Sequence, residues 1–526
     1  MVIALTLLAC DKAEDPAVTP ASELDAEELL VRASLDLRGV RPTTAELDRV
    51  SADPSAYDAL VDEFLADPRF EDRATDLFAE VFLTRTETFN VRFDGFDLTG
   101  ISYYDMLRAV GEEAPRIVAH TAADDLPITE IVTGDWTMAD PTTARLWPVD
   151  YPAGTSGWQQ VRWTDGRPPA GVLAANSFYW RYPSTDSNAN RKRANQISRI
   201  LLCHDYLTRP IDFDRNVNLL DSEAIDDALH TNPGCIACHA SLDPLAAYLF
   251  GFWTYEFTAS EVSNYHPARE RQWQDYLGTS PAYYGQPGSD LSDLGWQIAA
   301  DERFPQCLVE HVTEGLLRRD VGVDDADRLT EHREALISSG LKLKPVFASV
   351  VRSPEYKAAG APKMATTDLL ADQVEDLTGF RWLGMDGRDL LRTDQQGFQT
   401  LGGGADGVFV TRAASAPNAT ILLVQERLAE GAAAYVVEHD VLEPSSARLF
   451  TAIDFTETTE TDRDAMVAQV QALHRRIFGH QVDADSAEVE ANLGLWDELY
   501  ALDHDTTTAW SGVLTALLRD PDFLLY

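Results

Sequence analysis

The chain has few basic residues, few cysteines and no long hydrophobic run after its first ten residues. Its 526 residues include 43 lysines and arginines against 86 aspartates and glutamates, which gives a formal net charge of -43. This charge repels nucleic acid and anionic membrane surfaces, so neither is expected as a partner. A basic protein partner would be attracted, although a uniformly solvated acidic surface without a chosen partner explains the charge more simply.

Several catalytic signatures are absent from the sequence. It contains no recognisable serine nucleophile elbow, metalloprotease helix, dinucleotide-binding fingerprint or pair of catalytic carboxylates. A hydrolase or a nicotinamide-dependent enzyme is therefore not indicated. No segment beyond the N-terminus is expected to span a bilayer.

Strand-like alternation is rare, whereas helical spacing recurs throughout, which predicts a mainly α protein made of several helical bundles with loop-rich insertions. The hydrophobic content of 45% is enough for large cores, and the length predicts about three folded domains. The expected parts are a signal and tether over 1–21, an N-terminal helical domain over 22–164, a middle domain over 165–362 and a C-terminal helical domain over 363–526. The irregular segment 141–180 is expected to wrap over helices or to cover a site.

A helix-ending pattern occurs three times, in residues 65–70, 351–356 and 518–523. In each copy a proline forces the chain out of an amphipathic helix, and an aromatic residue two positions later can pack back on the bundle. An acidic helix is expected upstream of each copy. One helical module used three times explains the pattern, and so does common helix-ending chemistry in unrelated helices.

One short motif carries specific chemistry. The sequence Cys235-Ile236-Ala237-Cys238-His239 has the spacing of a covalent attachment site for c-type haem. On a helix, the two thiols lie on the same face, where each can form a thioether with a haem vinyl group. His239 can then be the proximal iron ligand. The motif predicts one covalent haem c in the middle domain.

Two other kinds of site use the same residue types. A thioredoxin-like motif should open a helix after a strand, but residues 224–230 have a helical pattern that Asn-Pro-Gly at 232–234 interrupts. A zinc site would need a fourth ligand, and the histidines on offer are isolated: His204, His230 and His266. Haem attachment is therefore the favoured interpretation over these two alternatives.

The residues after the motif sharpen this interpretation. Asp243-Pro244-Leu245 and the segment 250–252 (Phe-Gly-Phe) resemble the cytochrome-c-like domain of planctomycete-type surface lipoproteins, a large set of domains of unknown function also found in myxobacteria. Further similar segments are residues 33–42, 131–137, 170–173 and 190–195. The resemblance extends from about residue 23 to residue 526, and it implies a surface location and a haem cofactor without implying a defined reaction.

The N-terminus matches a bacterial lipoprotein signal. A short apolar run ends in Leu7-Leu8-Ala9-Cys10, and cleavage before Cys10 would leave a lipidated cysteine. The polar stretch 11–21 would then be a tether. Because the run is short and no basic residue precedes it, a short buried helix or strand is the alternative. The signal predicts export to the bacterial cell envelope, periplasmic or outer-surface, with the lipid as the sole membrane contact.

Two of the five cysteines remain after Cys10 and the haem motif are assigned, namely Cys203 and Cys307. In an oxidising compartment, a bridge between them would close a long loop around the haem motif and restrict the unfolded chain. The alternative is two buried thiols that behave as small hydrophobic residues. We expect the disulfide, because neither cysteine has another partner.

The distal iron ligand is less clearly indicated. Electron-transfer cytochromes usually supply a methionine, but the first methionine after His239 is Met364, beyond the middle domain. The distal position is therefore expected to hold His266, to be vacant, or to receive Met364 from a distant loop. The basic cluster Arg191, Lys192, Arg193 and Arg199 could bind haem propionates, or form a solvated helix face that pairs with local carboxylates.

Together these features predict an exported, lipid-anchored, monohaem c-type cytochrome-like protein that transfers electrons to an unidentified redox partner, for which the acidic charge favours a basic protein. Two alternatives stay open. A vacant distal position would favour a haem enzyme with an open iron site. The helical modules, which carry no evident chemistry, would suit a surface binding or scaffold protein with a structural or vestigial haem motif.

Overall fold

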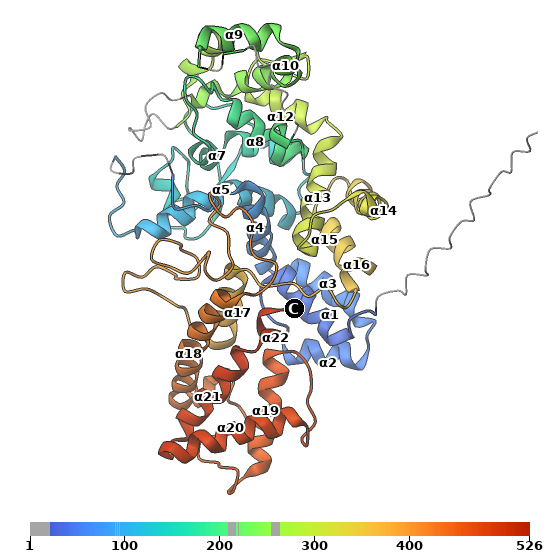
Figure 1. The fold of residues 1–526 in the computed structure, drawn as a ribbon, viewed down its shortest axis with the longest axis vertical. Coiled ribbons are helices and arrows are strands. Elements are labelled where there is room, and N and C mark those ends of the chain that lie inside the picture. Colours follow the sequence, from blue (N-terminus) through green and yellow to red (C-terminus); the bar gives the residue numbers. More distant parts are fainter. Residues whose placement is uncertain are drawn as a thin grey trace, which may run out of the picture.

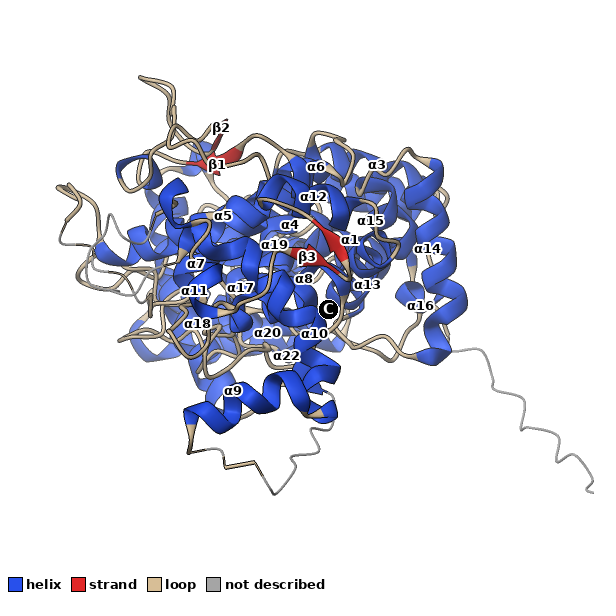
Figure 2. Ribbon diagram, turned by 90° about the horizontal axis from the view of Figure 1, so that it is seen from above, coloured by secondary structure: helices blue, strands red, loops and turns tan. Residues whose placement is uncertain are grey.

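The computed structural model describes residues 22–89, 91, 93, 95–208, 217–218, 220–253 and 264–526. Within these residues the protein is mainly α-helical, as the sequence predicts, with helices α1 to α22 (Figure 1). The named strands form two short antiparallel pairs. They are β1 (Thr137–Ala139) with β2 (Gln159–Val161), and β3 (Ala282–Tyr283) with β4 (Gln286–Pro287). Figure 2 shows that these strands occupy a small part of the fold.

The N-terminal part contains six helices, and the last two are joined by a short turn. These helices are α1 (Ala26–Arg38), α2 (Thr44–Ala52), α3 (Ala56–Ala66), α4 (Arg69–Phe82), α5 (Tyr103–Ala123) and α6 (Glu130–Thr133). The side chains of Asp25 and Thr43 cap α1 and α2 and satisfy backbone N–H groups that have no partner inside the helix. Helices α4 and α5 pack closely along their lengths.

The middle part carries the haem motif and is drawn at the top of Figure 1. Its first elements are α7 (Asn176–Arg181), α8 (Arg191–Leu202), η3 (Tyr206–Thr208), α9 (Ser222–Thr231), α10 (Pro233–Ala247), η4 (Tyr248–Phe252), η6 (Pro267–Arg269), α11 (Trp273–Tyr276) and α12 (Leu291–Ala299). They are followed by α13 (Arg303–Leu317), α14 (Ala326–Ser338), α15 (Lys344–Val351) and α16 (Pro354–Lys357), which lead back toward α1.

The C-terminal part lies at the opposite end of the molecule from α9 and α10 (Figure 1). Its helices are α17 (Thr367–Thr378), α18 (Ala419–Leu442), α19 (Arg463–Ile477), α20 (Ala487–Asp503), α21 (Thr506–Leu518) and α22 (Pro521–Leu524). Helix α18 packs against α21, and α21 packs against α20.

The three helix-ending patterns have the same structure. Helices α3, α15 and α21 each end just before the proline, and a new helix begins at or next to that proline. The aromatic side chains Phe70, Tyr356 and Phe523 are each 1% exposed. The expected upstream helices are α2, α14 and α20. The chain therefore contains three similar helical modules, α1–α4, α13–α16 and α19–α22.

The modules meet at a buried carboxylate on α1. Asp36 accepts hydrogen bonds from the Tyr356 hydroxyl (2.6 Å) and the Tyr526 hydroxyl (2.9 Å), and it forms an ion pair with Lys363. Burial lowers the pKa of Lys363 to about 8. A continuous hydrophobic core also runs from α1 to α22. The domain boundaries near residues 165 and 362 stay a prediction, because residues on both sides of each boundary share this core.

The irregular segment 141–180 packs on α5. Trp147 lies 5.8 Å from Trp180 and 6.0 Å from Trp163, measured between ring centroids. With Met106 and Leu107 of α5, these rings belong to a second, smaller apolar cluster. The segment therefore wraps over α5, which is one of the two expected roles.

The helical run Pro233–Phe252 has the length and composition of a membrane-crossing helix, so the expectation that no later stretch is long and apolar enough is wrong. However, 56% of its most apolar window is buried inside the protein. Leu245 and Ala246 of α10 and Leu249 of η4 are buried in the same core as the rest of the molecule. Packing inside the protein thus accounts for the apolar character of this run.

Candidate functional site

The haem motif lies in the first two turns of α10. Helix α9 ends at Thr231, and Pro233 occupies the first position of α10, where a backbone N–H is not needed. The side chain of Asn232 accepts a hydrogen bond from the Gly234 N–H (2.9 Å) and caps the helix. The helical stretch before the motif and its interruption at residues 232–234 are therefore as the sequence predicts.

The two motif thiols are free and half-buried. Cys238 packs against the main core, whereas Cys235 and Ile236 lie near the exposed end of α10. Because the thiols lie three residues apart on one helix, they are near the same face. Their partial exposure allows a planar group to reach both sulfur atoms without displacing a packed core. The donor set therefore fits a covalently attached haem.

The imidazole of His239 has a defined orientation. Its side chain is 24% exposed, and its Nδ1 lies 2.8 Å from Oδ1 of Asp243, one helical turn later. An ionised carboxylate can only accept a hydrogen bond, so Nδ1 carries the proton and donates. In the neutral imidazole, Nε2 then has the lone pair that a metal ligand requires.

Asp243 is held in turn by Arg191 of α8. The guanidinium Nε lies 2.7 Å from Oδ1, and Nη2 lies 2.9 Å from Oδ2. This two-point pairing is the strong geometry for an arginine and a carboxylate. Burial opposes the ionisation of Asp243, but the hydrogen bonds from His239 and Arg191 hold the pKa of Asp243 below its usual value. Sequence reasoning did not identify this contact, although the four-residue spacing from His239 to Asp243 was a signal for it.

The basic cluster of α8 is mostly engaged inside the protein. Arg193 is buried and donates to the carbonyl oxygens of Tyr182 and Phe252, among others. Arg199 donates to the carbonyl oxygen of Val81 (2.9 Å). Together with the Arg191–Asp243 pair, these contacts assign three of the four cations to structural roles. They leave Lys192 as the exposed member of the cluster.

The two proposed distal ligands lie away from His239. The backbone N–H of His266 donates to the carbonyl oxygen of Gly251 (2.8 Å), at the far end of the run that begins with α10. At 1.5 Å per residue, the twelve residues from His239 to Gly251 span ~18 Å. Met364 is buried and pairs with Leu525, which follows α22, and α22 lies away from α10 (Figure 1). The structure therefore does not bring either side chain to His239.

Another histidine, His204, packs beside a residue that contacts α10. Its ring lies edge-on against Tyr206, with centroids 4.7 Å apart. The Tyr206 hydroxyl lies 2.9 Å from Oγ of Ser241. Because successive helical residues are rotated by about 100°, Ser241 and His239 point in nearly opposite directions. Tyr206 therefore contacts the face of α10 that is turned away from His239.

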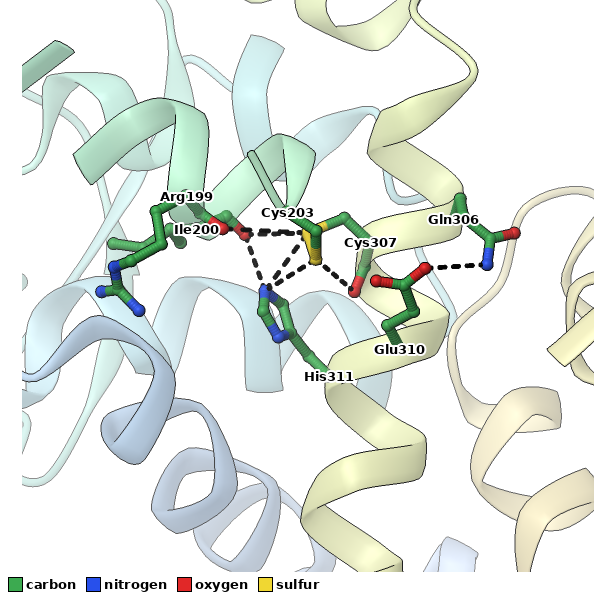
Figure 3. Close-up of a disulfide and its surroundings, with 7 residues drawn as sticks. All are labelled: Arg199, Ile200, Cys203, Gln306, Cys307, Glu310 and His311. Atoms are coloured by element: carbon green, nitrogen blue, oxygen red, sulfur yellow. Dashed lines mark hydrogen bonds between the residues drawn. A yellow bond between two sulfur atoms is a disulfide. The ribbon is translucent and has the colours of Figure 1, made fainter. Parts of the chain in front are cut away.

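Cys203 and Cys307 form a disulfide that joins the end of α8 to α13, with a Cα–Cα distance of 5.2 Å (Figure 3). His311 lies beside it, and its Nε2 is 2.9 Å from the carbonyl oxygen of Ile200 and 3.3 Å from Sγ of Cys307. Burial lowers the pKa of His311 to about 4. Cys10 lies outside the described residues.

The structure argues against a preassembled zinc site. In the described part of the chain, the one group of three potential metal ligands that converge is Cys203, Cys307 and His311. Its two sulfur atoms are bonded to each other, so they offer no thiolate. A zinc ion would need ligands that converge on a common point. In the described residues, such convergence is not found for Cys235, Cys238 and His239.

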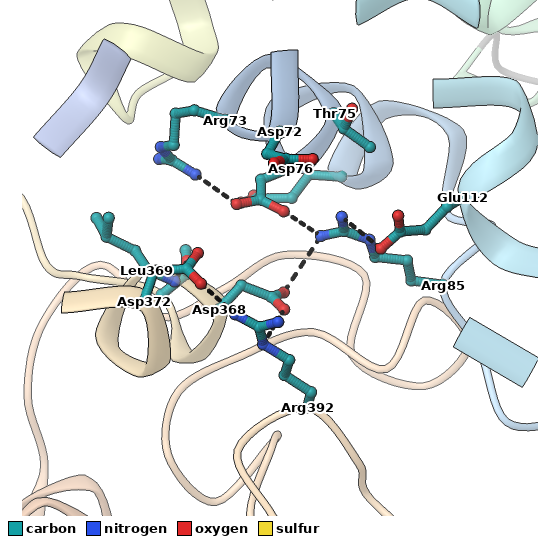
Figure 4. Close-up of polar contacts among 12 residues, drawn as sticks. Asp72, Arg73, Thr75, Asp76, Arg85, Glu112, Asp368, Leu369, Asp372 and Arg392 are labelled. Carbon is teal, nitrogen blue, oxygen red and sulfur yellow. Dashed lines mark hydrogen bonds and ion pairs between the residues drawn. The ribbon is translucent and has the colours of Figure 1, made fainter. Parts of the chain in front are cut away.

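A second concentration of charge lies where α4 and α5 meet α17 (Figure 4). Arg85 contacts Asp76 (2.6 Å), Glu112 (3.0 Å) and Asp368 (3.4 Å), and Arg392 contacts Asp368 (3.6 Å). Burial opposes the ionisation of Glu112, but the arginines around it, Arg116 first, hold its pKa well below the usual range. Each of these acidic groups has an arginine partner, so the ion pairs of this cluster join distant parts of the fold.

Comparison with known proteins identifies one domain. The family described as PSCyt2, a protein of unknown function (DUF1549), matches residues 8–115. The match covers α1 to α4 and the first half of α5, and it ends before the haem motif. No curated protein and no solved structure matches the chain. The chain thus contains a domain of unknown function, consistent with a protein built from such domains.

Proposed function

We propose that this protein is an exported, lipid-anchored, cytochrome-c-like protein of the planctomycete and myxobacterial type that carries one covalent haem and transfers electrons. The observation that carries the proposal is the arrangement on α10. Two free thiols precede a histidine whose Nδ1 is hydrogen-bonded to Asp243 and whose Nε2 is then available as a metal ligand. When bound, the haem would supply one-electron chemistry, while Cys235, Cys238 and His239 hold it.

Two further features support the location. The lipoprotein signal ending at Cys10 would anchor the chain to a bacterial membrane. The Cys203–Cys307 disulfide is typical of proteins outside the reducing cytoplasm. The net charge of -43 would favour a basic redox partner over an acidic one.

The test is haem attachment in a bacterial host that has the cytochrome c maturation machinery. We expect haem staining after denaturing electrophoresis and a c-type pyridine haemochrome spectrum. The variant Cys235→Ala with Cys238→Ala should lose both signals, since no other thioether anchor remains. The matched control, Cys203→Ser with Cys307→Ser, should keep them. A wild-type protein without covalent haem would contradict the proposal and favour a scaffold with a vestigial motif.

A haem enzyme with an open iron site is the second candidate. It is favoured by the positions of His266 and Met364, which lie away from His239. Carbon monoxide binding to the ferrous protein separates the two candidates. Ready binding would favour the enzyme. If His266 is the distal ligand, carbon monoxide should bind only after His266→Ala, and a far-red sulfur-to-iron absorption band would instead identify Met364.

A further inference from the structure

The proximal side of the proposed haem site contains a polar chain of three residues. His239 donates from Nδ1 to Oδ1 of Asp243 (2.8 Å), and Arg191 reaches the same oxygen through Nε (2.7 Å). The first two residues are on α10 and the third is on α8, so the chain connects the ligand helix to its packed neighbour. Asp243 is buried, which strengthens its electrostatic effect on its partners.

We propose that Asp243 is a positioning residue that makes His239 an electron-rich proximal ligand and so lowers the reduction potential of the haem, with Arg191 limiting that effect. The inference rests on the proposed function. A histidine that donates to a carboxylate is a stronger electron donor at its other nitrogen than one that donates to a neutral group. A stronger donor stabilises the oxidised, more positive metal.

Arg191 opposes the effect of Asp243 because its guanidinium and the His239 ring share one carboxylate. Its guanidinium engages both oxygens, with Nη2 2.9 Å from Oδ2, and so draws negative charge away from the oxygen that faces His239. Removing Arg191 leaves the carboxylate to His239 alone. Loss of Asp243 and loss of Arg191 should therefore shift the potential in opposite directions, although both break the same ion pair.

The experiment is a spectroelectrochemical redox titration of the full, haem-loaded protein. Asp243→Asn keeps the side-chain shape and an oxygen that can accept from Nδ1, but removes the negative charge. We expect it to raise the ratio of reduced to oxidised protein about tenfold at a fixed potential, which is about 59 mV for one electron. Arg191→Gln should change the ratio in the opposite direction.

Two matched variants separate this effect from a general change of charge. Asp226→Asn removes an exposed negative charge on the adjacent helix α9, and Arg427→Gln removes an exposed positive charge on α18. Both should shift the ratio by a much smaller factor, because screened charges without contact to His239 act weakly.

The outcomes distinguish the inference from the proposed function. Equal haem loading with unchanged potentials in Asp243→Asn and Arg191→Gln would overturn the inference alone. A shift of both variants in the same direction would also overturn it, and would assign the pair to the support of α10. Absence of haem from the wild type would overturn the proposed function instead. If Asp243→Asn does not bind haem, the reduction potential of Arg191→Gln decides. A lowered potential supports the inference, and an unchanged or raised potential overturns it.

Discussion

The buried junction at Asp36 and the haem motif on α10 both place a carboxylate among hydrogen-bond donors. They differ in whether polar groups remain available to bind a ligand. At the junction, the side chains of Asp36 and Lys363 are 1% and 5% exposed, and the carboxylate is shared among an ammonium group and two tyrosines. On α10, the contact with Asp243 occupies one nitrogen of His239 and leaves the other, together with two free thiols, available to a ligand.

The comparison teaches that the groups that hold the fold together and the groups that offer chemistry lie in different places. Figure 1 shows α10 at one end of the molecule, whereas α1, α16 and α22 lie near its centre. Substitutions at the junction should therefore affect stability most. Substitutions in the haem motif should affect ligand binding and leave stability nearly unchanged.

The largest expected effect is at the junction. Asp36→Ala removes the partner of a buried lysine, and breaking a buried ion pair in this way costs about 3–5 kcal/mol. Denaturant-induced unfolding followed by circular dichroism measures the loss. The control is Asp58→Ala, which removes an exposed pair with Arg352 and should cost about 1 kcal/mol or less. A loss at Asp36 as small as that at Asp58 would remove the contrast between buried and exposed pairs.

The disulfide should come next. Cys203→Ser with Cys307→Ser opens a loop that spans 104 residues and includes α9 and α10. We expect the protein to lose about 2–5 kcal/mol, because the unfolded chain regains conformational entropy. Reduction of the wild type should produce a similar shift in the denaturation midpoint. If the doubly substituted protein unfolds at the wild-type midpoint, the bridge does not stabilise the fold.

His311 should make stability depend on pH. Its folded-state pKa of about 4 lies below the ordinary histidine value of 6.5, so between these values the unfolded chain binds more protons than the folded protein. Stability should therefore fall as the pH is lowered from about 6.5 to about 4. His311→Gln should reduce this slope in thermal unfolding, whereas His230→Gln, at an exposed position on α9, should not. Equal slopes in all three proteins would contradict the assignment.

The smallest effect should come from the haem motif itself. In protein produced without haem, Cys235→Ala with Cys238→Ala should change stability by about 0.5 kcal/mol or less. The thiols are half-buried, and alanine is a good helix former. Thermal unfolding beside the wild type checks this expectation. A loss comparable to that at the disulfide would mean that the first turns of α10 stabilise the fold as its buried end does, and the comparison of the two regions would fail.

Much of the local structure could be predicted from the sequence. Proline and its flanking residues mark the ends of α3, α15 and α21, because the proline ring is incompatible with the helix interior. The Asn-Pro-Gly break places α10 at the motif for the same reason. The pairing of Cys203 with Cys307 was also predicted, because these two cysteines remain once the other three are assigned.

The contacts between distant segments could not be predicted in this way. Asp36 meets Tyr356 and Lys363 across more than 300 residues. Arg191 meets Asp243 across 52 residues, so a cation that could have bound a haem propionate or a local carboxylate pairs with a carboxylate on another helix. The hydrophobic periodicity around one residue does not indicate its distant partner, since a helical pattern shows which face is buried and not which segment covers it.

The sequence by itself determined where the helices end, which residues can hold a haem and which cysteines remain for a bridge, because these properties depend on neighbouring residues and on chemical type. The tertiary structure alone decided that His239 donates to Asp243, that Arg191 shares this carboxylate, and that His266 and Met364 lie away from the motif. The physical reason is that side-chain pairing depends on how helices pack in three dimensions, and many packings are compatible with the same local pattern.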